Sequence, residues 1–191
     1  TFSISGGADG ALFTIDSATG ELAFAAAPDY EAPADADGDN VYNVQVQADD
    51  QNGLTGTKNV AVTVQPVNDN APVITSSAAA NVNENTTAVL TVTATDADLP
   101  AQTVTFSISG GADGALFTID SATGELAFAT APDYEAPADA DGDNAYNVQV
   151  QADDQNGLTS TQDIVVSVQP VNDNAPVITS PASAEVEENT T

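Results

Sequence analysis

The sequence predicts an all-β protein made of tandem seven-stranded Greek-key β-sandwiches, with one complete unit flanked by two partial ones. Two observations support this prediction. The chain of 191 residues repeats itself, because Thr1–Gly7 recurs as Thr105–Gly111, an offset of 104 residues. Within one repeat, apolar and polar side chains alternate with the period of a half-buried strand. About seven short strands in roughly 100 residues are typical of a Greek-key sandwich.

The alternation places each expected strand of the complete unit. The expected strands lie around Val73–Ile74, Leu90–Ala94, Val104–Ile108, Phe117–Ile119, Leu126–Phe128, Tyr146–Val150 and Ile164–Val168. The equivalence of the repeats predicts a further strand at Val177–Ile178. No stretch has the period of an amphipathic helix. The Phe residues fall in phase with inward strand positions and are expected in the core, rather than as a stacking platform for sugars. Tyr30 and Tyr134 lie between acidic residues, and their role stays open.

A polar junction separates the units. The stretch from Gln65 to Thr75 returns letter for letter at Gln169 to Thr179. It contains three consecutive amide or carboxylate side chains and then a proline, which blocks a helix and resists a sheet. We therefore expect residues 1–70 to be the back part of one unit, residues 71–174 a complete unit and residues 175–191 the start of a third.

The charge of the chain excludes several classes of partner. It has 29 acidic residues against a single base, Lys58, and its formal net charge is −28. Nucleic acids are not expected to bind, because phosphate groups are contacted by Lys and Arg. No apolar run is long enough to span a bilayer. A hydrophobic content of 41% argues against the disorder that extreme acidity otherwise indicates.

The available ligands point to a hard cation. The chain has no Cys and no His, so neither a disulfide nor an ordinary zinc site can form. Oxygen ligands remain, and these favour calcium or magnesium. The acidic residues collect at predicted strand ends and turns instead of spreading along the strands. Since alternate strand ends lie at opposite poles of a sandwich, we expect these clusters at the two tips, where neighbouring units meet.

Five of these acidic stretches, in their order along the chain, resemble the calcium-binding set of cadherin repeats. They are Asp29-Tyr30-Glu31, Ala48-Asp49-Asp50, Asn68-Asp69-Asn70-Ala71-Pro72, Asn83-Glu84-Asn85 and Asp96-Ala97-Asp98. The run from Asp133 to Asn144 is more similar to bacterial cadherin-like domains of large surface proteins. The resemblance covers essentially the whole chain, and it implies calcium as the bound cation.

The resemblance also implies which residues hold calcium. At the first junction the implied ligands come from both units and the linker: Asp29, Glu31, Asn68, Asp69, Asn70, Asp96, Asp98 and Asp154. At the second junction they are Glu84, Asp133, Glu135, Asn172, Asp173 and Asn174. The chain departs from the family at Pro66 and Pro170, where an aspartate is usual, and at Asn83, where Pro is preferred. The number of ions at each junction therefore stays open.

A second acidic motif lies outside the junction set. Aspartates at alternate positions occur in both repeats, namely Asp35, Asp37 and Asp39, and Asp139, Asp141 and Asp143. The spacing is similar to the start of an EF-hand loop, but no Glu stands at the twelfth position and no helices flank the motif. The pattern leaves two interpretations open, an additional metal loop and a polar turn.

The sequence thus predicts an extracellular, calcium-rigidified tandem-repeat segment of an adhesin or surface fibre. Its expected partners are neighbouring repeats of the same chain and like chains, in a fibre or in homophilic contact. The alternative is a calcium-dependent module that binds carbohydrate or protein, with a glycan as partner. A glycoside hydrolase that uses paired carboxylates is not expected, because the acids are duplicated in every unit and none is isolated in an apolar cleft pattern.

Overall fold

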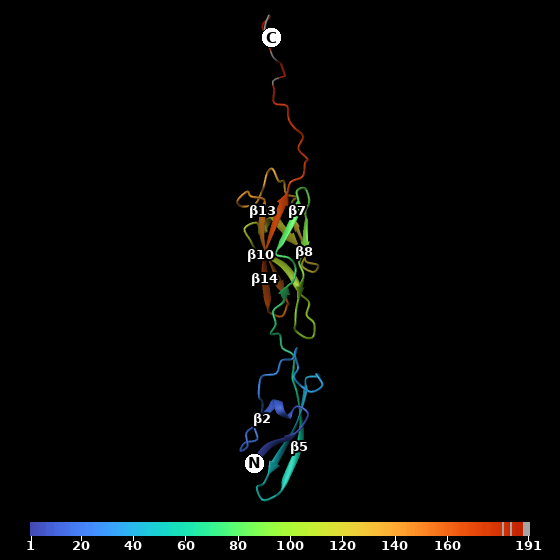
Figure 1. The fold of residues 1–191 in the computed structure, drawn as a ribbon, viewed down its shortest axis with the longest axis vertical. Coiled ribbons are helices and arrows are strands. Elements are labelled where there is room, and N and C mark those ends of the chain that lie inside the picture. The colour runs from blue at the N-terminus through green and yellow to red at the C-terminus, as the bar shows by residue number, and fades with distance from the viewer. Residues whose placement is uncertain (181, 184, 189–191) are drawn as a thin grey trace.

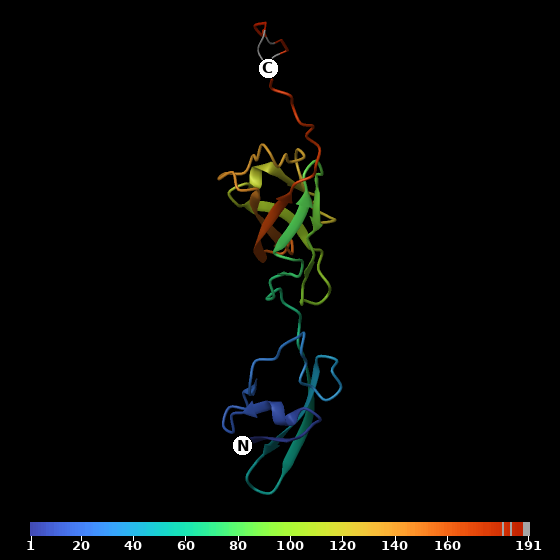
Figure 2. The same ribbon diagram turned by 45° about the horizontal axis from the view of Figure 1, so that its top comes forward.

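The computed structural model describes residues 1–180, 182–183 and 185–188. Two β units lie end to end along the long axis of the molecule, and a single linker segment joins them (Figure 1). The turned view shows the hairpin of the first unit at the pole opposite the linker, and loops of both units at the junction (Figure 2). Among the described residues there is no helix with the length and apolar composition that crossing a bilayer requires.

The first unit contains two small sheets. The strands β1, β4 and β5 form an antiparallel sheet in the order β1-β4-β5, and β2 pairs with β3. A turn of 3-10 helix, η1, stands between β1 and β2. The bounds of these elements are Phe2–Gly6 for β1, Gly10–Leu12 for η1, Phe13–Ile15 for β2, Leu22–Phe24 for β3, Val41–Asp49 for β4 and Thr55–Thr63 for β5.

The second unit is a complete sandwich. One sheet has the strand order β10-β13-β14-β7 and the other has the order β11-β12-β8, which confirms the predicted all-β class. The bounds are Ala79–Asn83 for β7, Ala88–Thr91 for β8, Thr105–Gly110 for β10, Gly114–Leu116 for the 3-10 turn η2, Phe117–Ile119 for β11, Glu125–Phe128 for β12, Ala145–Asp153 for β13 and Thr159–Gln169 for β14.

The strand predicted at Leu90–Ala94 is divided into β8 and β9 (Ala94–Thr95), and the strand predicted at Val73–Ile74 is followed by a further strand, β7, which was not predicted. The segment β6 (Val73–Ile74) pairs antiparallel with β9, whereas β7 crosses to the other sheet and pairs parallel with β14. When β6 and β7 count as one strand, and β8 and β9 as another, the unit has the predicted seven. The division lets the first strand contribute to both sheets, which closes the sandwich along one edge.

The predicted strand at Val177–Ile178 is wrong for this structure. Both residues lie outside any strand and are 83% and 87% exposed. Their equivalents Val73 and Ile74 form a strand because Thr95 and Ala94 pair with them. None of the described residues plays that pairing role for Val177 and Ile178, so the local sequence alone does not fix a strand.

Aromatic residues pack in the core of each unit as the alternation predicts. In the second unit Phe117 and Phe128 stack with ring centroids 4.5 Å apart, and Tyr146 meets both rings edge-on. Phe106 is 8% exposed there, but its equivalent Phe2 is 38% exposed. The difference arises because the first unit has no described counterpart of residues 88–104, which cover this part of the core in the second unit.

Candidate metal centre at the junction between the units

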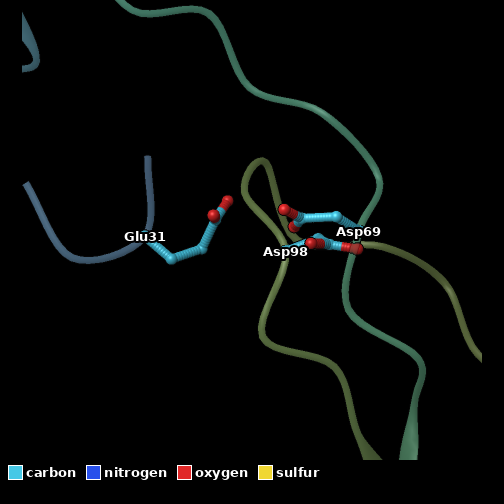
Figure 3. A group of neighbouring side chains, drawn as sticks. All are labelled: Glu31, Asp69 and Asp98. Carbon is cyan, nitrogen blue, oxygen red and sulfur yellow. The ribbon is translucent and has the colours of Figure 1, made fainter. Parts of the chain in front are cut away.

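Three segments far apart in the sequence converge on the first junction. The loop after β3 brings Glu31, the linker after β5 brings Asp69, and the loop after β9 brings Asp98. One carboxylate oxygen from each residue lies within 4.8 Å of the other two. Figure 3 shows the Glu31 side chain extending from its own unit toward Asp69 and Asp98. The group therefore spans the boundary between the two units.

A second group shares Asp98 and lies on the side of the second unit. It comprises Asp96, Asp98 and Asp154, again with one oxygen each within 4.8 Å of the others. Asp98 and Asp154 are each 1% exposed. The Oδ2 atoms of Asp96 and Asp154 are buried and have no hydrogen-bond partner among the described residues. Two buried carboxylate oxygens thus face the group without a donor.

The pKa of Asp154 shows how the fold keeps this carboxylate ionised. Burial alone would raise its pKa, but the backbone N–H of Asn156, then the side-chain amide of Asn68, and then the backbone N–H groups of Leu158 and Gly157 hold it below its ordinary value. The three backbone donors all contact Oδ1, at 2.7, 3.0 and 2.9 Å for Asn156, Leu158 and Gly157. Oδ2 is buried and has no partner within hydrogen-bond distance among the described residues.

Calcium fits this donor set. A buried carboxylate oxygen without a partner is costly, and a cluster of like charges is more costly still. The only Lys or Arg of the chain, Lys58, lies in the middle of β5 and pairs in register with Val46. Calcium accepts six to eight oxygen ligands in adaptable geometry. The five carboxylates of the two overlapping groups would hold the ion, and its charge would offset their mutual repulsion.

The second junction repeats part of this arrangement. Glu135 and Asp173, the equivalents of Glu31 and Asp69, form a group with Glu84, within the same 4.8 Å limit. Glu84 is 2% exposed and accepts hydrogen bonds from the N–H groups of Tyr134 at 2.8 Å and Val171 at 2.6 Å. Burial, followed by the charges of Glu84 and Asp173, raises the pKa of Glu135. The two junctions thus show complementary parts of one kind of site.

Some predicted ligands lie outside these groups. Asp29 and Asp133 cap the turns that follow them, since each accepts a hydrogen bond from the N–H two residues on, at 3.0 Å. Among the described residues neither joins an acidic group. Asn172 is exposed. Turn capping is the role that the structure shows for the two aspartates.

The linker asparagines donate hydrogen bonds in this structure. The Asn70 side-chain N–H contacts Asp98 Oδ1 at 2.8 Å and Asp69 Oδ1 at 2.9 Å. The Asn174 amide likewise donates to Asp173 at 2.9 Å. Asn68 Oδ1 accepts a hydrogen bond from Gln102 Nε2 at 2.6 Å. Asn70 and Asn174 thus contact the carboxylates through their amide N–H groups, and the Asn68 oxygen contacts Gln102.

Two polar side chains of the junction were not predicted. Gln102 donates to Asn68 and to Asp98 Oδ2, the latter at 3.2 Å, and Asn156 donates to the Gln102 carbonyl oxygen. Gln102 lies in the segment that has only one copy in the chain, so the repeat gave no signal for it. Because Gln102 is uncharged and lies outside the acidic motifs, no other sequence pattern identifies it as a junction residue.

The aspartates of the loop motif also come together. Asp35, Asp37 and Asp39 form one group and Asp139, Asp141 and Asp143 form another. Asp39 raises the pKa of Asp37 by charge repulsion, with burial and Asp35 adding to the effect. A buried aspartate outside the predicted motifs, Asp9, accepts hydrogen bonds from Ala36 N at 2.7 Å and Asn43 N at 2.6 Å. It fastens the loop to the sandwich.

Comparison with known proteins identifies the kind of repeat. Residues 78–169 match the Cadherin domain family, which confirms the predicted cadherin-like repeat in the second unit. Human protocadherin gamma-A2 is 41% identical over 130 residues, which cover 64% of this chain and 13% of that protein. Human protocadherin Fat 1 is 33% identical over 186 residues, or 93% of this chain and 4% of that protein. The chain thus spans a small part of these relatives.

Solved structures agree with the fold. Protocadherin gammaB7 EC3-6, described as a cis-dimer, has a TM-score of 0.68 and 27% identity, and the match covers 96% of this chain and 44% of that one. Drosophila N-cadherin EC1-4 has a TM-score of 0.69 at 22% identity, over 88% and 42% of the two chains. The homologous cadherin ectodomains are extracellular or cell-surface proteins. The bacterial-type resemblance stays a prediction.

Proposed function

We propose that the chain is a calcium-rigidified segment of an extracellular adhesin or surface fibre, with residues 1–70, 71–174 and 175–191 as its successive units. The observation that carries the proposal is the convergence of Glu31, Asp69 and Asp98 from two units and their linker. A cation held by all three residues would couple the orientation of one unit to that of the next. Binding energy would then appear as stiffness of the array.

Without calcium, the same residues work against a straight array. Carboxylates within a few ångströms of one another repel, and the linker that carries Asp69 is a single chain without strand pairing between β5 and β6. The free chain should therefore bend at the junction. In a tandem array, stiffening every junction lengthens the whole, which suits a role in reach and mechanical strength.

Calcium titration calorimetry tests the proposal. The full chain should bind calcium at up to millimolar concentration, and the Asp69→Ala variant should bind more weakly while circular dichroism shows both units folded. Glu21→Gln, which removes an exposed charge outside every acidic group, is the matched control and should behave like the parent chain. Absence of calcium binding by the parent chain at millimolar concentration would refute the proposal.

Association of like chains is the second candidate function. The protocadherin gammaB7 EC3-6 structure is described as a cis-dimer, and the match to it covers 96% of this chain. With a net charge of −28, the chain repels its own copies until cations are bound. Sedimentation velocity should therefore show any association only with calcium present. A monomer at high protein concentration in calcium would rule out this candidate and leave the stiffening role intact.

A further inference from the structure

Each repeat carries an acidic loop that lies apart from the junction groups. In the first unit the carboxylate oxygens of Asp35, Asp37 and Asp39 converge within 4.8 Å. In the second unit the equivalent residues Asp139, Asp141 and Asp143 do the same. None of these six residues belongs to a junction group. The loops therefore need an explanation of their own.

An ordinary polar turn of the same chain provides a comparison. Asp16 is exposed, and its Oδ1 accepts hydrogen bonds from the N–H groups of Ala18 at 2.8 Å and Thr19 at 2.7 Å. Local backbone donors and water satisfy such a carboxylate. Its geometry needs no ion.

Asp35 differs from Asp16 in both respects. It is only 8% exposed, and while Oδ2 accepts a hydrogen bond from Asp39 N at 2.8 Å, Oδ1 is buried and has no partner among the described residues. Asn40 Oδ1, in the same loop, is also buried without a partner. In the second unit Asn144 Oδ1 is likewise buried and unpartnered, whereas Asp139 Oδ1, the equivalent of Asp35 Oδ1, accepts a hydrogen bond from Asn144 N at 3.3 Å. Buried oxygens without donors are rare and indicate a missing positive partner.

The loop is held in place from outside the acidic cluster. Tyr42 OH accepts a hydrogen bond from Ala34 N at 3.1 Å, and Asp9 binds Ala36 N at 2.7 Å, so the residues on both sides of Asp35 are fastened to the sandwich. Tyr146 and Asp113 repeat these contacts in the second unit, at 3.1 and 2.7 Å. The carboxylates are thus gathered by the fold despite their repulsion.

We infer that each acidic loop binds one calcium ion within its own repeat, separately from the ions proposed at the junctions. The three carboxylates and the unpartnered Asp35 Oδ1 supply the oxygens of the first site, and water completes the coordination that calcium requires. Such an ion would stabilise a single repeat without changing how two repeats are joined. Binding at the loop therefore does not depend on whether the junction binds calcium.

Terbium luminescence gives a test, because tyrosine excitation sensitises a lanthanide bound nearby. Tyr30 and Tyr134 stand beside the junction residues Glu31 and Glu135, so the signal of the loops is the part that the loop variant removes. Tyr42 and Tyr146 each contact the residue that precedes a loop, through the hydrogen bonds given above. Terbium added to the full chain should luminesce and calcium should displace it. The Asp37→Asn and Asp141→Asn double variant changes one exposed residue in each loop and should reduce terbium and calcium affinity at these sites about tenfold or more.

Calcium counting by equilibrium dialysis completes the test. The loop variant should bind one ion fewer for each loop altered, and the Glu31→Gln variant of the junction should keep the tyrosine-sensitised terbium signal of the loops. The Glu21→Gln and Glu125→Gln double variant is the charge-matched control. If the loop variant keeps both the parent ion count and the terbium signal, the inference is wrong. The junction proposal would then stand or fall on the Asp69→Ala titration alone.

Discussion

The carboxylate of Glu31 accepts a hydrogen bond from the backbone N–H of Leu99 at 3.1 Å, across the boundary between the two units. The two residues are 68 positions apart in the chain. The loop that carries Asp98 therefore lies within reach of Glu31. A calcium ion held by these residues would add to a contact that the two loops make directly.

Glu31→Gln tests the contribution of the first unit to the junction. The substitution keeps the side-chain length and an acceptor for the Leu99 N–H but removes the charge. We expect a loss of calcium affinity of about tenfold or more, which equals about 1.4 kcal/mol or more, with both units still folded. Titration calorimetry measures the loss, with Glu21→Gln as control. Equal affinities of the two variants would place the ion away from Glu31.

Asp154→Asn separates a metal ligand from a structural aspartate. The amide oxygen can still accept the backbone hydrogen bonds of the β13–β14 turn, while one buried charge leaves the group with Asp96 and Asp98. In chelator, the melting temperature of the variant should equal or exceed that of the parent chain, because repulsion is relieved. In calcium it should be lower. A similar decrease under both conditions would indicate a purely structural role.

The calcium-free chain should be most stable at about pH 4. The pKa values of Glu135, Asp37 and Asp141 are raised, so between the unfolded and folded values the native state binds more protons and stability rises as pH falls. The pKa values of Asp154 and Asp120 are lowered, and their stabilisation is lost as pH falls further, through their folded values. Melting temperatures measured from pH 7 to pH 3 should first rise and then fall as the pH is lowered.

The matched variant for this pH profile is Glu135→Gln. It should show a smaller gain in melting temperature between pH 7 and pH 4 than the parent chain. A steady fall in the stability of the parent chain over the whole range would contradict the assignment of the raised pKa values.

Asp113→Ala should destabilise the second unit without a direct effect on the junction. The buried Asp113 carboxylate accepts hydrogen bonds from Ala140 N and Asn147 N, both at 2.7 Å. Their loss should lower the free energy of unfolding by about 3 kcal/mol in chelator. Urea unfolding measures the change, and Asp163→Ala, an exposed aspartate of β14, is the control. A change below that of the control would show that the loop is held by other contacts.

The repeat and the strand alternation were sufficient to predict the sandwich. Phe117, Phe128 and Tyr146 fall in phase and do pack together. The strand at Val177–Ile178 could not be judged in this way, because a two-residue strand exists only where a partner pairs with it, as Thr95 and Ala94 do for Val73 and Ile74.

The acidic motifs predicted correctly which residues lie close together, but they did not predict the role of each residue. Glu31, Asp69 and Asp98 meet, but Asp29 caps a turn and the Asn70 amide donates instead of offering its oxygen. Motif spacing cannot distinguish a ligand from a residue that orients a ligand, because both roles use the same polar side chains. Gln102 shows the converse case, a junction residue with no motif at all.

Distance measurement between the two units tests the central claim most directly. The chain has no Cys, so Ser17→Cys and Ser121→Cys, at equivalent exposed positions, provide unique sites for a pair of spin labels. Double electron–electron resonance should give a broad distance distribution in chelator and a narrow one in calcium, and Glu31→Gln should need more calcium for the same narrowing. Distributions of equal width with and without bound calcium would contradict the account.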